Sequence, residues 1–301
     1  MTARDRFGLT VLGALVLLRL IAVFIDVDPA ALTDAPMLGP SFAHPLGTDA
    51  LGRDLLLRVI ESSEAFFGPG LFACLAALVL GVPAGALVGY RPGSRPAAVV
   101  RFGLTIVAAW PQLVLVVVVV AIFTASIDDP AAWSHLRLYL LAGVLGLSFV
   151  PQVAGAVGEK VAWFRRERFV EAAVAHGLGH ARILGLHILW ANCRNVVLRQ
   201  ACTLFGTFLL VETSLSYLGD YGVPPPRPSW GNILAGLRSQ VIHVRSLLRP
   251  ESLAPGDVLD AVLRAVNEGG AVALATPTVL IVVSIAGVLA AGEYFAARDR
   301  R

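Results

Sequence analysis

The chain has 301 residues, of which 56% are hydrophobic and only 15% are charged. A soluble domain carries about 25% charged residues, so this composition argues against an ordinary soluble enzyme and indicates a polytopic membrane protein. The formal net charge of +3 is small, and we expect no nucleic-acid partner.

The cysteines and the single lysine are not placed for metal or phosphate chemistry. Cys74, Cys193 and Cys202 lie in or beside apolar segments and are not spaced as zinc ligands, so we expect neither a disulfide framework nor a metal site. The only lysine, Lys160, follows Glu159, whereas a P-loop needs glycine immediately before its lysine. The sequence therefore lacks a Walker motif, and any ATP would be bound by another subunit.

Six apolar segments are long enough to span a membrane, for which about 20 residues are needed. The first segment follows Arg4 and Arg6 and could be read as a signal peptide. Its length, Arg19 within it and the lack of a small-residue cleavage site favour a retained span instead. The predicted spans are 7–25, 66–90, 102–124, 138–157, 196–218 and 271–291.

The distribution of arginine and lysine predicts how these spans are oriented. With the N-terminus in the cytoplasm, most of the 24 basic residues fall on the inner side. We therefore predict an all-α protein with six spans and both termini in the cytoplasm, in which residues 1–301 form one transmembrane domain. Residues 26–65 and 219–270 would then be external, and residues 158–195 would be cytoplasmic.

One polar stretch interrupts the apolar chain, RRERFVEAAVAHGLGHARILGLHILWANCRN at 165–195. Residues 165–176 are good helix formers, and Gly177 and Gly179 predict a break before a second helix over 180–189. Two interpretations are open for the pair: helices held at the membrane surface by arginines on anionic headgroups, or a docking element for a cytoplasmic partner. One apolar face of the second helix would carry Ile183, Leu184, His187 and Ile188.

The first helix of this stretch contains Glu171-Ala172-Ala173, followed by Gly177 and, after ten further residues, by Ile188-Leu189. This pattern resembles the EAA signature of ABC importer permeases. In that family the segment forms a coupling helix, which sits in a groove of the ATPase subunit. The resemblance implies that the ATPase-coupling residues are Glu171, Ala172, Ala173, Gly177, Ile188 and Leu189.

The sequence HPLGTDALGRD at 44–54 resembles a block of the oligopeptide, dipeptide and nickel subfamily of these permeases, specifically of its C-type subunit. Pro45 and Gly47 predict a turn, and Thr48 or Asp49 would cap the helix that follows. We interpret the block as a structural lead into that helix rather than as a substrate contact. Its motif residues are His44, Pro45, Gly47, Asp49, Gly52, Arg53 and Asp54.

Two further stretches, ETSLSYLG at 212–219 and PPPRPSWG at 224–231, resemble another block of the same subfamily. Acidic residues inside a membrane usually face a bundle interior or a water-filled cavity. For Glu212, in the predicted fifth span, structural pairing and lining of the transport pathway therefore remain alternatives. The external motif residues of this block are Pro228, Ser229, Trp230 and Gly231.

The chain departs from the family pattern at four places. The centre of the coupling signature reads Ala175-His176-Gly177-Leu178 instead of Ala-Leu-Gly-Ala, which alters the expected docking surface. Trp190 stands where the family usually has a helix-stopping proline, so the second short helix could run directly into the fifth span. Glu64 stands where a base is usual, which reverses a charge at the outer mouth of the second span. The external loop is longer than usual over 240–268, and this surplus would either pack on its own subunit or contact an external binding protein or the partner permease.

The resemblance implies a type I ABC importer permease fold and a role in transport. The chain would be a transmembrane permease subunit for peptides or related small solutes in the inner membrane of a prokaryote. Its implied partners are a second, B-type permease, two ABC ATPase subunits and an external substrate-binding protein. It would not be an enzyme and would hold no cofactor, because the ATPase subunits bind ATP and magnesium. The alternatives are a receptor or scaffold that does not transport, a secondary transporter, or a permease for nickel or another small solute.

Overall fold

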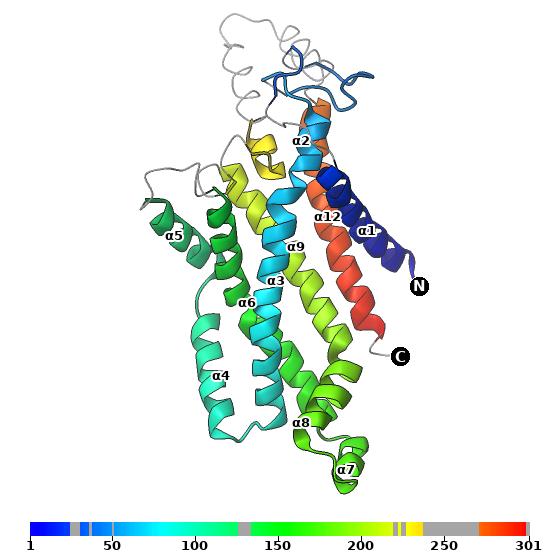
Figure 1. The fold of residues 1–301 in the computed structure, drawn as a ribbon, viewed down its shortest axis with the longest axis vertical. Helices are drawn as coiled ribbons and strands as arrows, with labels where there is room; N and C mark the ends of the chain where they lie inside the picture. Colours follow the sequence, from blue (N-terminus) through cyan, green and yellow to red (C-terminus); the bar gives the residue numbers. More distant parts are fainter. Residues whose placement is uncertain are drawn as a thin grey trace, which may run out of the picture.

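The computed structural model describes residues 1–24, 31–35, 38–49, 51–125, 134–218, 222–223, 227–236 and 271–298. Within these residues the secondary structure is helical, apart from one isolated bridge between Thr48 and Asp54. The helices lie roughly along one long axis (Figure 1). They are α1 (Ala3–Phe24), α2 (Leu55–Glu61), α3 (Ser63–Tyr90), α4 (Arg95–Ala108), α5 (Gln112–Ala125), α6 (Ser134–Phe164), α7 (Arg168–Ala175), α8 (His180–Arg182), the π-helix η1 (Ile183–Cys193), α9 (Arg194–Leu218) and α12 (Ala271–Arg298), with a further helical turn pair at 230–236.

Five helical segments among the described residues are long and apolar enough to cross a membrane. They correspond to five of the six predicted spans. The protein is therefore an all-α membrane protein, as the sequence predicts. The number of six spans and the orientation of the termini stay predictions. The five segments are Ala3–Phe24, Leu55–Tyr90, Leu138–Phe164, His180–Leu218 and Ala275–Arg298.

The predicted third span, 102–124, is wrong as a single helix. Helix α4 ends at Ala108 and α5 begins at Gln112, and the two follow one another along the long axis (Figure 1). Pro111 lacks a backbone N–H and disfavours helical geometry at Trp110. Prolines within α3 and α6 do not break those helices, because α3 and α6 pack closely together, whereas the only buried residue of α4 is Ala97.

The core is built on a close contact between α3 and α6. Along α3, a small residue recurs at every fourth position, which places these residues on one side of the helix. A Cβ added at Gly85 would overlap the carbonyl oxygen of Ala154, and one added at Gly89 would overlap that of Gly158. Small residues let two membrane helices approach until their backbones touch. The series on α3 is Ala73, Ala77, Gly81, Gly85 and Gly89.

Helix α12 packs between α1 and α9 (Figure 1). Gly8 of α1 lies against the backbone of Ala290 and Ala291. On the other side of α12, Arg199 Nη2 lies 3.0 Å from Glu293 Oε1. These contacts attach the first and last helices to α9.

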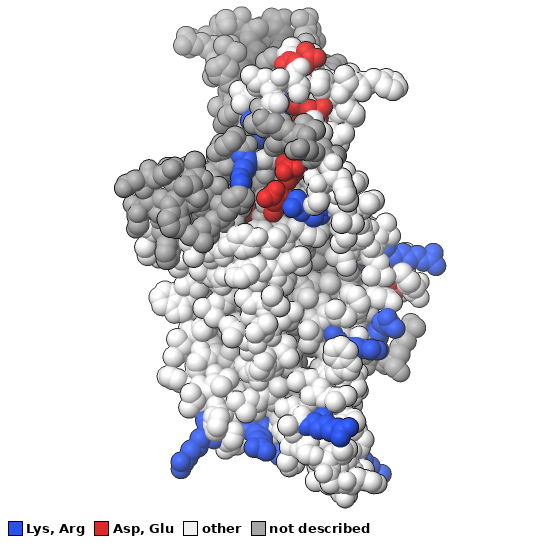
Figure 2. All heavy atoms as spheres, in the orientation of Figure 1, with Lys and Arg blue, Asp and Glu red and all other residues white. Residues whose placement is uncertain are grey.

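The two ends of the molecule differ in the segments that form them and in their charged side chains. The described residues 31–35, 38–49 and 51–54 lie at one end, and α7 and α8 lie at the other (Figure 1). On the face shown in Figure 2, basic side chains gather at the end with α7, and the surface between the two ends is mostly uncharged. Helix α6 extends to Phe164, so the first residues of the predicted loop 158–195 continue a helix. The predicted insertion 240–268 lies outside the described residues.

Candidate functional site

Residues 165–182, which the sequence predicts to include a docking element and which we call the docking loop, contain α7 and α8. Helix α7 buries Val170 on its inner side. Glu171 and Ala172 are exposed, and Ala173 is partly buried against the core. The predicted coupling signature therefore presents a carboxylate and a small side chain at the outer surface of α7. A small side chain at such a position lets another protein approach the helix backbone closely.

A glycine ends α7 because the chain turns there through a left-handed conformation. Gly177 has φ +80°, a region that glycine adopts readily and residues with a Cβ avoid. Its N–H donates to the carbonyl oxygen of Val174 at 2.9 Å, and the N–H of Leu178 donates to that of Ala173 at 3.1 Å. This pair of bonds is the Schellman arrangement that closes helix C-termini.

The docking loop is attached to the end of α3 by a contact that the sequence did not indicate. Tyr90 Oη lies 2.9 Å from His180 Nδ1, and the Tyr90 ring is largely buried. The Arg165 guanidinium lies 5.9 Å from the centre of the same ring. Tyr90 is the last residue of α3 and His180 the first of α8, so this contact ties the docking loop to a long helix of the core.

The helix after the docking loop continues without interruption into α9. Residues His180–Leu218 form one helical segment, which confirms the expectation that replacing the proline with Trp190 lets the helix run on. Trp190 itself is 75% exposed. Ile188 is fully buried and Leu189 is partly buried, so Ile188 packs in the core of this chain.

The predicted apolar face of this second helix is wrong in part. His187 is exposed, whereas Ile183, Ile188 and Cys193 are fully buried. The buried residues are five apart because Ile183–Cys193 is a π-helix, which pairs residues five apart. The sequence prediction assumed α-helical spacing.

At the opposite end, the described residues 33–35, 38–49 and 51–54 form a folded cap. Gly47 and Gly52 have φ values of 82° and 76°, and a Cβ on either would overlap a backbone carbonyl oxygen of this segment. The Thr48 hydroxyl donates to the carbonyl oxygen of Ala35 at 2.8 Å and accepts from the N–H of Leu38 at 2.9 Å. Gly47 and Gly52 are thus needed for the tight turns of the HPLGTDALGRD block.

Asp49 is the buried centre of the cap. Its Oδ1 accepts the backbone N–H groups of Leu51 at 2.8 Å and Arg53 at 3.0 Å, and its Oδ2 accepts Arg53 Nε at 2.8 Å. Arg58 Nη1 from α2 also binds Oδ2. Burial alone would raise the pKa of the Asp49 carboxyl, but the two backbone bonds and the Arg58 charge together hold that pKa below its ordinary value.

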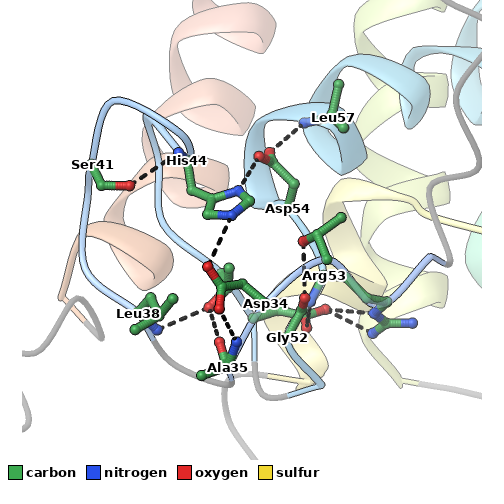
Figure 3. Close-up of polar contacts among 12 residues, drawn as sticks. Asp34, Ala35, Leu38, Ser41, His44, Gly52, Arg53, Asp54 and Leu57 are labelled. Carbon is green, nitrogen blue, oxygen red and sulfur yellow. Dashed lines mark hydrogen bonds and ion pairs between the residues drawn. The ribbon is translucent and has the colours of Figure 1, made fainter.

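Asp54, rather than Thr48 or Asp49, caps the helix that follows. Its Oδ1 accepts the N–H of Leu57 at 3.0 Å at the start of α2. Its Oδ2 lies 2.7 Å from His44 Nδ1, while His44 Nε2 lies 3.7 Å from Asp34 Oδ2. Figure 3 shows the His44 ring between the two carboxylates. The predicted cap was wrong because Thr48 and Asp49 are used within the turn.

Trp230 joins the segment after α9 to α2. Its indole Nε1 donates to the carbonyl oxygen of Val59 at 3.1 Å, and its ring centre lies 4.8 Å from that of Phe66. Pro228, Ser229 and Gly231 are also buried. The residues of the SWG motif therefore form a tight junction between helices.

Glu212 is part of the same junction and is only 1% exposed. Its Oε1 accepts the hydroxyl of Ser216 at 2.7 Å, and its Oε2 lies 3.4 Å from the hydroxyl of Thr213. Ser229 also hydrogen-bonds to this carboxyl group. In this conformation Glu212 is paired with hydroxyls inside the chain. Ser216 carried no signal in the sequence beyond its position one helical turn after Glu212.

Within the described part of the chain, no group of three or more histidine, cysteine, aspartate or glutamate side chains could hold a metal ion. His176 Nδ1 lies 2.8 Å from the carbonyl oxygen of Ala172, and His180 contacts Tyr90.

Similarity to known proteins places these features in a family. No protein-family model matches the chain. It is 30% identical over 233 residues to a dipeptide transport system permease protein, DppC, of Alkalihalophilus pseudofirmus, covering 77% of this chain and 72% of the relative. The chain belongs to the ABC importer permeases. This permease is also 28% identical to a glutathione transport system permease protein, GsiD, of Pectobacterium atrosepticum, over 68% of this chain and 63% of the relative.

A third relative is a di/tripeptide transport system permease protein, DppC, of Pseudomonas aeruginosa, which is 31% identical over 65% of this chain and 60% of its own length. These similarities identify the permease as a C-type subunit and confirm the resemblance seen in the sequence. It is a multi-pass protein of the bacterial inner membrane and a transport permease. Permeases of this kind work with ATPase and substrate-binding partners.

Proposed function

We propose that this permease imports peptides or related small solutes as half of a transport pathway. A B-type permease would form the other half, two ABC ATPase subunits would dock at the α7 end, and an external binding protein would deliver the solute at the cap end. The exposed Glu171 and Ala172 on α7, at the end opposite the cap, carry this proposal. The peptide assignment is supported by the dipeptide, di/tripeptide and glutathione systems named among its relatives.

The chain would couple ATP hydrolysis to transport mechanically. ATP and magnesium would be held by the ATPase subunits, whose closure would displace α7. The bond between His180 and Tyr90 would carry this displacement to α3, and the continuous helix His180–Leu218 would carry it to the cap end of α9. Binding energy in the partners would thus shift the population between inward-open and outward-open states.

The residues of the coupling signature would have two different roles. Glu171, Ala172 and the partly buried Ala173 would contact the ATPase, with Gly177 fixing the turn after them. Ile188 and Leu189 would instead anchor the second helix in the core. A pathway role for Glu212 would require the segment at 229–236 to move away from α9, since Glu212 is buried beneath it.

Reconstitution tests the proposal directly. The permease would be placed in vesicles with its B-type partner, both ATPases and the binding protein, and uptake of labelled di- and tripeptides would be measured with and without ATP. We expect peptide uptake that requires ATP and the binding protein. Uptake of a nickel chelate in place of peptides would contradict the substrate class, and ATP-independent uptake would contradict the mechanism.

A further inference from the structure

The connection between the docking loop and α9 has an unusual helical geometry. The π-helix η1 runs for 11 residues, whereas π-helices mostly occur as single turns, frequently at functional sites. In an α-helix, residues five apart point in directions about 140° apart. In η1, Ile183, Ile188 and Cys193 are five apart and all fully buried. The π geometry therefore keeps three residues on the core side that an α-helix would distribute around its circumference.

One side chain reinforces the π geometry. Asn192 Nδ2 donates to the carbonyl oxygen of His187, five residues earlier, at 2.6 Å. This carbonyl is the acceptor that π pairing assigns to the backbone of Asn192, so the side chain adds a second donor at the same place. Asparagine side chains that bond nearby backbone groups compete with α-helical pairing. The imidazole of His187 is exposed and takes no part in this bond.

The position of η1 makes it the link through which the docking loop is joined to α9. Just before η1, the His180 side chain is hydrogen-bonded to Tyr90 of α3. At the other end, Cys193 is buried in the core. Between these ends η1 contacts α3 and α6. A displacement of the docking loop relative to α9 therefore acts on η1.

We propose that η1 is a register joint, which converts from π to α pairing when the ATPase subunits close on the docking loop. Asn192 is the positioning residue that holds the π register in the absence of nucleotide. The inference rests on the proposed function, because the ATPases supply the displacement. The conversion exchanges one set of backbone hydrogen bonds for another, so each backbone group in η1 can remain paired. It also turns Cys193 away from the core side relative to Ile183, and such register changes are two-state rather than gradual.

The rate at which the Cys193 thiol reacts would show whether η1 has π or α pairing. The assembled complex would be treated with N-ethylmaleimide, and the labelled cysteines would be located by peptide mass spectrometry. We expect Cys193 to be protected without nucleotide and to label about tenfold faster when ATP is trapped in the ATPases. In Asn192→Leu, Cys193 should label at the faster rate without nucleotide. Cys74, buried in α3, should stay protected in every state.

His187→Leu is the matched control, because it changes an exposed side chain and keeps the carbonyl acceptor. It should label as the native complex does. Equal labelling of Cys193 with and without trapped ATP, in a complex whose uptake is driven by ATP, would overturn the register joint. The comparison with and without trapped ATP uses the native chain, so it tests the proposal even if the Asn192→Leu variant does not assemble. A native complex without ATP-driven uptake would contradict the proposed function instead.

Discussion

Trp230 and Val59 are 171 residues apart in the chain, and the indole N–H of Trp230 donates to the carbonyl oxygen of Val59 at 3.1 Å. This bond joins the SWG motif after α9 to the short helix that follows the HPLGTD block. Two motifs that are distant in the sequence thus form one junction at the cap end. The Trp230 ring is 1% exposed and contacts Phe66 of α3, so the junction also reaches the core.

Trp230→Phe tests the hydrogen bond separately from the packing. The phenyl ring fills most of the space but leaves the Val59 carbonyl oxygen without its donor, so we expect a loss of about 1–3 kcal/mol of stability. Trp230→Ala should cost about 3–5 kcal/mol, because it also leaves a cavity. Thermal unfolding in detergent measures both. Trp190→Phe, at an exposed position, should unfold like the native chain; an equal loss there would contradict the assignment.

The contact of α3 with α6 should not tolerate a larger residue at its centre. In Gly85→Leu the side chain would meet the Ala154 backbone, so we expect a loss of about 1–3 kcal/mol or more from overpacking. The matched control is Gly155→Leu on α6, since no neighbouring atom lies within 4 Å of a Cβ added at Gly155. Fluorescence-detected size-exclusion chromatography after heating compares the two. Similar unfolding temperatures for both variants would show that the helices do not meet at Gly85.

Gly177 should be sensitive to a single added methyl group although it is exposed. A Cβ at φ +80° strains the backbone by roughly 1–2 kcal/mol, so Gly177→Ala should open the turn after α7 and lower both ATP-driven uptake and stimulated ATPase activity. Gly179→Ala is the control, because Gly179 has φ −64° and open space around it. If the two alanine variants transported equally, the left-handed turn would not be needed for coupling.

The Asp49 carboxylate should stabilise the cap in a way that depends on its partner Arg58. Asp49→Asn leaves the buried Arg58 guanidinium without its counter-charge, and breaking such a buried pair costs about 3–5 kcal/mol. Because the pKa of Asp49 is held below its ordinary value of 3.8, its contribution is present above about pH 4 and is lost as the pH falls through the lowered pKa. Thermal unfolding of the native chain and Asp49→Asn should converge at low pH. A constant difference between them across pH would contradict the ion pair.

Much of this fold follows from apolar run lengths and glycine positions. Five spans, the break at Gly177 and the continuous helix through Trp190 were predictable because they depend on local hydropathy and local backbone preference. The third span was mispredicted because the length of an apolar run does not show how Pro111 acts beside α4, a helix that buries only Ala97. Prolines at 69, 83 and 151 lie in equally apolar segments, yet the packing of α3 and α6 keeps those helices intact.

The sites were harder to predict than the fold. The motif blocks pointed to the right segments, but the contacts within them depend on residues far apart in sequence. Tyr90 with His180 and Trp230 with Val59 are examples. The π-helix was missed because the prediction assumed α-helical spacing, which placed His187 on the buried face. Asp54 was passed over as a cap because Thr48 and Asp49 are equally suited by residue type, and only the folded turn shows that they are already engaged.

Ala172→Trp tests the central claim, that the exposed face of α7 couples ATP hydrolysis to transport. The indole would occupy the surface on which the ATPase is proposed to dock, while Val99→Trp places the same side chain at an exposed position on α4. In vesicles that contain the whole importer, we expect Ala172→Trp to lower ATP-driven peptide uptake and stimulated ATP hydrolysis together by more than about tenfold. Val99→Trp should leave both near the native rate. Native uptake and hydrolysis by correctly assembled Ala172→Trp would contradict the account.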